Sequence, residues 1–240
     1  MKSVEFYFDL GSPYSYLAYY RLLQIAEQQE IQIVYKPILL GGVFKATGNR
    51  SPIEIPVKGV YSILDMQRWA EYYHIPMQMN PHFPMNTLTL MRILTGVQLL
   101  HLEKFEQVLK LLFDAMFGTP QNLNELTVLA EVLKPSGFSV EDIMSMVQSD
   151  VVKQKLITET EQAILRGIFG APTFFVGDEM YWGQDRLHFV EQALNEGYSL
   201  YGSPTMTFNG SEVIVGQVVV KDVEDESEVP QGLKDALAQQ

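Results

Sequence analysis

The sequence of 240 residues contains no cysteine. This absence excludes disulfide bonds and zinc sites built on thiolates. It also excludes thiol–disulfide exchange by the protein's own side chains.

The sequence also has no apolar run that is long enough to span a bilayer. The chain enters a predicted strand at once, without the basic region and cleavage site of a secretory signal, and Leu237-Ala238-Gln239-Gln240 is no peroxisomal or retention address. We therefore expect a cytoplasmic protein that does not act at a membrane.

Positive charge is scarce: 17 Lys and Arg residues face 29 Asp and Glu residues, for a net charge of −12. This balance argues against nucleic acid and anionic membrane as partners. A small anionic ligand would need a local group of cations.

The apolar fraction of 47% is ordinary for a soluble globular protein, and the length allows one or two domains.

One N-terminal stretch organises the rest of the chain. Val4–Leu10 is predicted to be a buried strand, and Gly11 permits a sharp turn after it. Ser12 then stands where an N-cap belongs and Pro13 where a first helical residue belongs, in a helix that runs to about Gln29. The Ser12 hydroxyl would lie at the positive end of this helix, a place that stabilises an anion such as a thiolate. A plain capping role is the alternative interpretation.

A second strand, Ile31–Lys36, completes a βαβ unit, which favours parallel pairing. A long loop rich in Gly, Asn and Pro is predicted from Leu39 to Pro52, and it carries Lys45 and Arg50. We interpret both of these cations as solvated.

From Gly59 to about Gly167 the pattern is helical and predicts a bundle of five or six segments. The Met and Leu residues of this region are interpreted as core. The segments are Ile63–Tyr73, Thr87–His101, Phe105–Phe117, Asn124–Lys134, Val140–Asp150 and Val151–Arg166.

Strands resume at Ala171–Val176 and Glu179–Trp182, joined by a hairpin turn at Gly177-Asp178, and an amphipathic helix follows from Gly183 to about Leu194. Sheet, bundle and sheet predict an α/β domain interrupted by an all-helical one. In the last stretch, 198–240, we expect a hairpin of Thr205–Phe208 and Val213–Val220 that turns at Asn209-Gly210, then an acidic run over Asp222–Glu228; we assign this stretch no role.

This order resembles the thioredoxin-like fold with a large helical insertion, as in the bacterial disulfide oxidoreductases. The resemblance implies a thioredoxin-like domain of residues 1–58 and 168–197 and an insertion domain of residues 59–167. The redox motif of that group, C-x-x-C, is replaced here by Ser12-Pro13-Tyr14-Ser15, so its activity cannot be carried over.

A closer resemblance, over about residues 4–194, is to the 2-hydroxychromene-2-carboxylate isomerases and their relatives, the kappa-class glutathione transferases. It rests on several short motifs in this order and spacing. These are Phe8-Asp9 with Ser12-Pro13-Tyr14-Ser15, Lys45-x-Thr47-Gly48-Asn49, Pro56-x-Lys58, Asp65-x-x-Arg68-Trp69-Ala70, Phe83-Pro84-x-Asn86-Thr87, Gly170-Ala171-Pro172-Thr173-Phe174 and Trp182-Gly183-Gln184-Asp185-Arg186.

The resemblance implies a catalytic role for Ser12, whose hydroxyl would donate a hydrogen bond to the thiolate of bound glutathione. It implies that Pro172 follows a cis peptide bond and that the backbone of Ala171 binds the cysteinyl part of glutathione. These roles require that the Ser12 hydroxyl be reached through a cleft beside Pro172.

For the two ends of glutathione the resemblance implies four further residues. Asn49 and Lys58 would hold the glycyl end, Lys58 by its charge on the carboxylate. Gln184 and Asp185 lie at a helix start, where Asp185 could pair with the γ-glutamyl ammonium group. The alternatives are an ordinary surface lysine for Lys58 and a favourable first-turn charge for Asp185.

The function implied is that of a glutathione-dependent isomerase that interconverts 2-hydroxychromene-2-carboxylate and trans-o-hydroxybenzylidenepyruvate. A small aromatic carboxylate would be the substrate, and the family leads us to expect a homodimer. Tyr14, Phe44, Trp69 and Phe83 are candidates for an apolar substrate slot, although core packing explains each equally well.

Two alternatives stay open. A kappa-like glutathione transferase would use the same thiolate site to conjugate electrophiles. A non-catalytic thioredoxin-like binding or chaperone protein would need an apolar cleft but no glutathione site.

Asn86 could merely cap the helix that begins near Thr87. The four histidines show no ligand spacing, so we propose no metal site.

Overall fold

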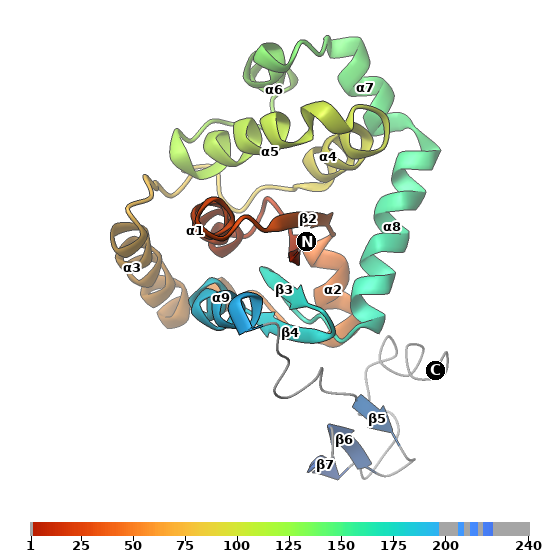
Figure 1. The fold of residues 1–240 in the computed structure, drawn as a ribbon. Helices are drawn as coiled ribbons and strands as arrows, with labels where there is room; N and C mark the ends of the chain where they lie inside the picture. Colours follow the sequence, from red (N-terminus) through yellow and green to blue (C-terminus); the bar gives the residue numbers. More distant parts are fainter. Residues whose placement is uncertain (1, 197–205, 209–211, 216–217, 223–240) are drawn as a thin grey trace.

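A four-stranded mixed sheet in the order β2-β1-β3-β4 forms the centre of the structure (Figure 1). The computed structural model describes residues 2–196, 206–208, 212–215 and 218–222. β1 (Ser3–Phe8) pairs in parallel with β2 (Gln32–Pro37), and β3 (Thr173–Val176) pairs antiparallel with both β1 and β4 (Glu179–Trp182). The predicted βαβ unit and the β3–β4 hairpin at Gly177-Asp178 are both confirmed.

The α-helices assigned in the described residues are α1 Pro13–Gln29, α2 Leu40–Thr47, α3 Pro56–Tyr73, α4 Leu88–Leu100, α5 Phe105–Phe113, α6 Leu126–Leu133, α7 Val140–Gln148, α8 Asp150–Leu165 and α9 Leu187–Glu196. Short 3-10 helices are η1 Pro52–Glu54, η2 Leu102–Lys104, η4 Lys134–Ser136 and η5 Gln184–Arg186, and α5 continues into a π-helical turn, η3 Asp114–Gly118. The segments predicted over the insertion are present, with α3 starting three residues before the expected limit at Gly59, because Pro56 supplies a favourable first helical residue.

Alternation along the strands divides the core between the two faces of the sheet. Phe6 and Phe174 point to the face covered by α1 and α9, where their rings stack 5.3 Å apart. Tyr7 and Phe175 point to the opposite face and pack with Val43 of α2 and with residues of α8. These fully or nearly fully buried aromatic side chains make the sheet a rigid base for the loops at the carboxyl end of β1.

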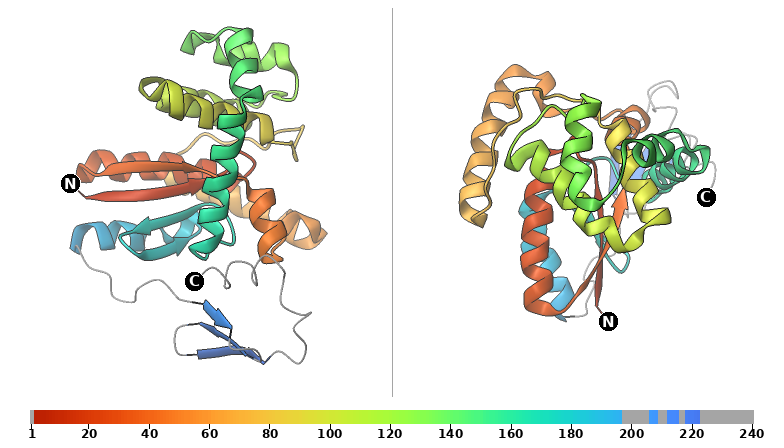
Figure 2. Two further views of the ribbon diagram at one scale, coloured as in Figure 1. Left: turned by 90° about the vertical axis from the view of Figure 1, so that its right-hand side faces the viewer. Right: turned by 90° about the horizontal axis from the view of Figure 1, so that it is seen from above.

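α4 and α5 lie as a layer over α1 and β2, and α6 and α7 lie on the far side of this layer (Figures 1 and 2). α8 runs from there along the side of the sheet. α3 lies apart from that layer, beside α1. One continuous apolar cluster joins strand residues such as Phe8 to helical residues such as Phe113 and Leu94. The domain limits at 58 and 168 therefore stay a prediction, since sheet and insertion share this core.

The loop predicted from Leu39 to Pro52 is wrong over its first half, which forms α2. Gly41 and Gly42 lower the local helix propensity, which is why the sequence pattern favoured a loop. The helix is stabilised by two side chains that are distant in the sequence and bind its N-terminal amides. The Thr160 hydroxyl accepts from Leu39 N at 3.0 Å, and the Asp9 carboxylate accepts from Leu40 N at 2.8 Å.

A separate three-stranded sheet is formed by β5 (Met206–Phe208), β6 (Glu212–Val215) and β7 (Val218–Asp222). β5 and β6 pair antiparallel, as the predicted hairpin requires, but the strand expected over Val213–Val220 is divided between β6 and β7. The expected turn at Asn209-Gly210 and most of the acidic run lie outside the described residues. Among the residues that the structure describes, no helix has the length and hydropathy needed to cross a bilayer.

Candidate functional site

Ser12 occupies the N-cap of α1, with Pro13 as the first helical residue, as predicted. Its hydroxyl accepts a hydrogen bond from Ser15 N at 3.1 Å and donates one to the backbone carbonyl of Ala171 at 2.9 Å. A hydroxyl has a single proton, so both functions of this group are used within the protein. The Tyr14 N–H, by contrast, has no hydrogen-bond partner among the described residues, as the first amides of a helix often have none.

Ser12 is only 5% exposed, and Pro172 is buried beside it. The side chain that was expected beside an open cleft is therefore almost completely covered in the structure. Ala171, whose carbonyl accepts from Ser12, is half-buried.

The loop that presents Ala171 is held on both sides. The Ala171–Pro172 peptide bond is cis, as the resemblance implied, and the Pro172 carbonyl accepts from Gly183 N at 2.9 Å. Gly183 has φ +99°, and a Cβ at this position would meet the carboxylate of Asp185, so glycine is required here. The start of η5 is thereby fixed to the loop before β3.

Asn49 reaches the same loop from the C-terminal end of α2. Its side-chain amide donates to the carbonyl of Phe169 at 2.8 Å, and its side-chain oxygen accepts from Arg50 N at 2.8 Å. Asn49 thus supports the Ala171–Pro172 turn from two residues upstream.

Gln184 and Asp185 form the first turn after Gly183 and behave differently. Gln184 is buried, and its carbonyl accepts a hydrogen bond from the Tyr73 hydroxyl at 3.0 Å. Asp185 is partly exposed and forms an ion pair with Arg186. An ammonium group that bound Asp185 would share it with this arginine.

Lys58 is exposed in the first turn of α3, and among the described residues it has no ion pair or hydrogen bond. Ser62 and Asp65 follow it at spacings of four and seven residues, on the same face of the helix. Tyr14 meets that face, because its hydroxyl donates to Asp65 Oδ2 at 3.0 Å. Lys58 therefore lies on the side of α3 that faces the start of α1.

Tyr14 lies two residues after Ser12, and its hydroxyl is bound to Asp65, which lines a pocket. Burial raises the pKa of its phenol, and the carboxylates of Asp65 and Asp185 raise it further. The hydroxyl consequently remains a protonated donor at neutral pH.

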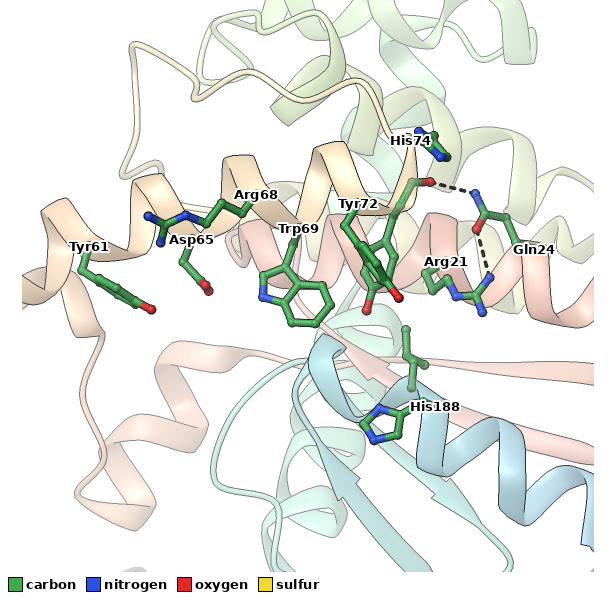
Figure 3. Close-up of a pocket in the computed structure, with 11 residues that line it drawn as sticks. Arg21, Gln24, Tyr61, Asp65, Arg68, Trp69, Tyr72, His74 and His188 are labelled. Carbon is green, nitrogen blue, oxygen red and sulfur yellow. Dashed lines mark hydrogen bonds between the residues drawn. The ribbon is translucent and has the colours of Figure 1, made fainter.

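A pocket of about 940 Å³ lies between α1, α3 and the start of α9 (Figure 3). Tyr61 and Asp65 lie towards one end of the row of side chains along α3, Trp69 lies near its middle, and His74 lies at the other end. Ser12 and Pro172 are not among its lining residues, so it begins one side chain away from them, at the Asp65 partner of Tyr14. The pocket is lined by Arg21, Gln24, Tyr61, Asp65, Arg68, Trp69, Tyr72, Tyr73, His74, Leu187 and His188.

The four aromatic candidates for a substrate slot separate into different environments. Trp69 lines the pocket, and Tyr14 is hydrogen-bonded to the pocket residue Asp65. Phe83 packs against the buried ring of Phe117, with centroids 6.3 Å apart, which makes it part of the core. Phe44 is half-buried on α2 and is not a lining residue.

Several residues near the site escaped the sequence analysis. Arg21, Gln24 and His188 line the pocket from α1 and α9, and no local pattern brings those helices together with α3. The Phe8-Asp9 motif gives Asp9 no role by itself, yet its carboxylate is buried beside the Ser12 turn. Lys45 and Arg50 are exposed, as interpreted, and Asn86 accepts from Leu88 N at 3.0 Å at the start of α4. Within the described part of the chain, no three His, Asp or Glu side chains are grouped as metal ligands.

Comparison with known proteins shows the family of the chain. The model of the DsbA-like thioredoxin domain matches residues 3–195, and a model of a domain of unknown function matches residues 185–222. The chain is 36% identical over 193 residues to a 2-hydroxychromene-2-carboxylate isomerase of Pseudomonas sp. (strain C18), covering 80% of this chain and 89% of the relative. It is 26% identical over 215 residues to glutathione S-transferase kappa 1 of Rattus norvegicus, covering 85% and 95%. A solved structure of a 2-hydroxychromene-2-carboxylate isomerase superposes with a TM-score of 0.72 at 31% identity, covering 81% of this chain and 95% of that one.

Proposed function

Because the chain belongs to the DsbA-like thioredoxin family, and within it to the group of the 2-hydroxychromene-2-carboxylate isomerases, we propose that it is a glutathione-dependent cis–trans isomerase. Its substrate pair would be 2-hydroxychromene-2-carboxylate and trans-o-hydroxybenzylidenepyruvate. The observation that carries the proposal is the contact of the Ser12 hydroxyl, at the N-terminus of α1, with the carbonyl that precedes cis-Pro172.

The residues present fit glutathione in charge and in hydrogen-bonding capacity. Lys58 is a cation with no ion pair among the described residues, which suits a glycyl carboxylate. Asp185 is a partly exposed carboxylate, which suits an ammonium group. Ala171 is half-buried and precedes cis-Pro172, so its backbone would pair strand-fashion with a short peptide.

Bound glutathione would supply the nucleophilic sulfur, whose reversible addition to a conjugated double bond permits rotation about that bond. The protein's part is to keep the thiol ionised. The unpartnered Tyr14 N–H and the α1 dipole stabilise negative charge at this point, and the Ser12 hydroxyl adds a donor once it is released from Ala171. Release requires that Ser12 rotate or that the Ala171 loop shift on binding.

The pocket beside Asp65 supports binding of an aromatic carboxylate. Trp69 and Tyr72 provide apolar surface on α3, and Arg68 is a cation without an ion pair in the described chain. The Tyr14 phenol, held protonated, stands between this pocket and Ser12. A cytoplasmic location is part of the proposal, since glutathione is abundant there.

The second candidate is a glutathione transferase of the kappa class, which the similarity to the rat enzyme favours. The same thiolate would form, but the adduct would be released. The two functions differ in the product, so the test is a glutathione-dependent assay with chromene carboxylates and model electrophiles, read for isomer against conjugate.

Binding is measured first, by calorimetry with glutathione. No binding at millimolar glutathione would exclude both enzymes and leave a non-catalytic thioredoxin-like binding or chaperone protein. Glutathione-dependent isomer formation without conjugate would support the isomerase.

A homodimer is also part of the proposal. η1 and the first half of α3 expose a row of large apolar side chains, which is unusual on a monomer. They are Ile53, Ile55, Val57, Val60, Tyr61, Ile63 and Leu64.

A further inference from the structure

Asp9, the first residue after β1, binds the starts of three helices with one buried carboxylate. Its side chain accepts from Gly11 N at 2.8 Å, from the Thr87 hydroxyl at 2.7 Å and from Leu40 N at 2.8 Å. Gly11 leads into α1, Thr87 is the N-cap of α4, and Leu40 is the first residue of α2. Asp9 is 3% exposed.

The same residue controls the backbone that carries Ser12. The Ser12 N–H donates to the Asp9 carbonyl at 3.0 Å, while Gly11 N binds the Asp9 carboxylate. Leu10 N is directed at the sulfur of Met91 at 3.4 Å. All three amides between Asp9 and α1 are therefore occupied, and the turn has no free donor with which to rearrange.

Space at this turn is equally limited. A Cβ on Gly11 would lie 3.3 Å from Asp9 Oδ1 and 3.3 Å from the methyl group of Thr87. The turn before Ser12 thus lies directly between the Asp9 carboxylate and Thr87, the N-cap of α4.

The three partners of the carboxylate are all donors, which is the bonding pattern of an ionised group. No cation contacts Asp9 among the described residues, so these three donors are the groups that face its carboxylate there. Burying an acid in this way carries a desolvation cost that an apolar side chain would not. A role beyond packing would explain why a carboxylate stands here.

We propose that Asp9 is a positioning residue for the reaction proposed above, on which this inference rests. Its carboxylate fixes the Ser12 hydroxyl relative to α2 and α4, so that the thiolate donor and the helical layer hold one relative position. Asp9 does not touch the reacting atoms; it acts through Ser12.

The test compares two ways of breaking this arrangement with a matched control. Asp9→Asn replaces one acceptor oxygen by an amide that faces donors, and Thr87→Val removes only the link to α4. Thr95→Val is the control, because the Thr95 hydroxyl is buried on α4 but donates to the carbonyl of Met91 and not to Asp9. Thr87→Ser retains the hydroxyl and serves as the rescue variant.

We expect Asp9→Asn to lower kcat by about tenfold to a hundredfold, with glutathione Kd changed by less than about threefold, because orientation is lost while the binding groups remain. Thr87→Val should lower kcat by a smaller factor, and Thr87→Ser and Thr95→Val should leave it near that of the wild type. Amide hydrogen exchange of the peptide that contains Gly11–Ser15 should quicken in Asp9→Asn and Thr87→Val alone.

The outcomes separate this inference from the proposed function. Unchanged kcat and unchanged exchange in a folded Asp9→Asn variant would overturn the positioning role. If Asp9→Asn does not fold, equal kcat in Thr87→Val and Thr95→Val would overturn it instead. A wild-type chain that binds no glutathione would overturn the proposed function, and the exchange measurement would still decide whether Asp9 holds the Ser12 turn.

Discussion

The hydroxyl of Ser12 donates its single proton to the backbone carbonyl of Ala171, 159 residues away in the sequence, at 2.9 Å. The same oxygen accepts from Ser15 N, so one side chain joins the start of α1 to the turn before β3. This contact defines the resting state of the candidate site, and it predicts how the site responds to ligands and substitutions.

The first prediction concerns removal of this hydroxyl. Ser12→Ala leaves the Ala171 carbonyl without a donor and removes the side-chain cap from Ser15 N, which keeps only its bond to the Ser12 carbonyl at 2.9 Å. We therefore expect the free energy of unfolding to fall by about 1–2 kcal/mol. The pKa of the thiol of bound glutathione should rise, because a donor to the thiolate is lost. Urea unfolding and the ultraviolet absorbance of the thiolate measure the two effects.

Ser15→Ala is the matched control. The Ser15 hydroxyl is fully buried three residues later in the same helix and has no hydrogen-bond partner in the described structure. Its removal should leave the bound-thiol pKa unchanged and stability equal or slightly higher. Equal effects of the two substitutions on the thiol pKa would contradict the role of Ser12.

The second prediction follows from the single proton. A ligand N–H that donates to the Ala171 carbonyl would replace Ser12 there and free its proton for the thiolate. Glutathione methylated at the cysteinyl amide cannot make this donation, so Ser12 would have to leave the carbonyl unpaired, at a cost of roughly 1–3 kcal/mol. We therefore expect this analogue to bind with a higher thiol pKa than glutathione.

Measurement of both ligands on the wild type and on Ser12→Ala completes a cycle. The substitution should raise the thiol pKa of glutathione and have little effect with the methylated analogue. The same increase with both ligands would show that Ser12 and the Ala171 carbonyl act independently.

The start of α1 could be predicted because its determinants are adjacent: Ser12 caps the helix and Pro13 begins it. α2 could not, since the groups that bind its first amides, on Asp9 and Thr160, are far away in the sequence. The pocket was missed for the same reason, since α1, α3 and α9 meet there only in the folded chain. The family motifs identified Asn49 as a candidate site residue, but its contact with Phe169 could be found only in the structure.

The third prediction isolates the charge of Lys58. This lysine is exposed in the first turn of α3, where a positive charge opposes the helix dipole, so Lys58→Ala should not destabilise the fold. Glutathione should bind about fivefold to tenfold more weakly, and its glycyl ethyl ester should bind the variant and the wild type almost equally. Calorimetry gives both values.

Lys45→Ala makes the same change in net charge at an exposed lysine in the last turn of α2. It should alter glutathione binding less than Lys58→Ala does. If Lys58→Ala weakened the binding of glutathione and of its glycyl ethyl ester by the same factor, the proposed contact of Lys58 with the glycyl carboxylate would be contradicted.

The fourth prediction concerns the apolar row on η1 and α3. Val60 is 64% exposed there, so Val60→Glu should weaken the proposed dimer by placing a buried, unpaired charge in its interface. Leu102→Glu is the control, because Leu102 is 67% exposed on η2, outside that row. Sedimentation should show a dimer for the wild type and the control and a monomer for Val60→Glu; a wild-type monomer at all concentrations would refute the dimer.

The fifth prediction concerns the pH dependence of stability that Asp9 causes. Burial raises the pKa of its carboxyl above the ordinary 3.8, and its hydrogen bonds to Gly11, Leu40 and Thr87 lower it only in part. At pH values between the ordinary pKa of the unfolded chain and the raised pKa of the folded chain, the folded chain holds a proton that the unfolded chain has released. The free energy of unfolding therefore falls as the pH rises through this window. Below about pH 3.8 both states are protonated and the penalty is absent.

Asn cannot ionise, so an Asp9→Asn variant should lack this dependence. The difference in unfolding free energy, wild type minus Asp9→Asn, should therefore decrease as the pH is raised from about 4 towards neutrality, by about 1.4 kcal/mol for each unit by which the pKa is raised. No other ionisable side chain contributes to the Asp9 shift, so the comparison reports on this carboxyl alone. Urea unfolding of both proteins across this range measures the difference. A difference that grows with pH would mean that the three donors outweigh burial and that the folded chain prefers the ionised acid.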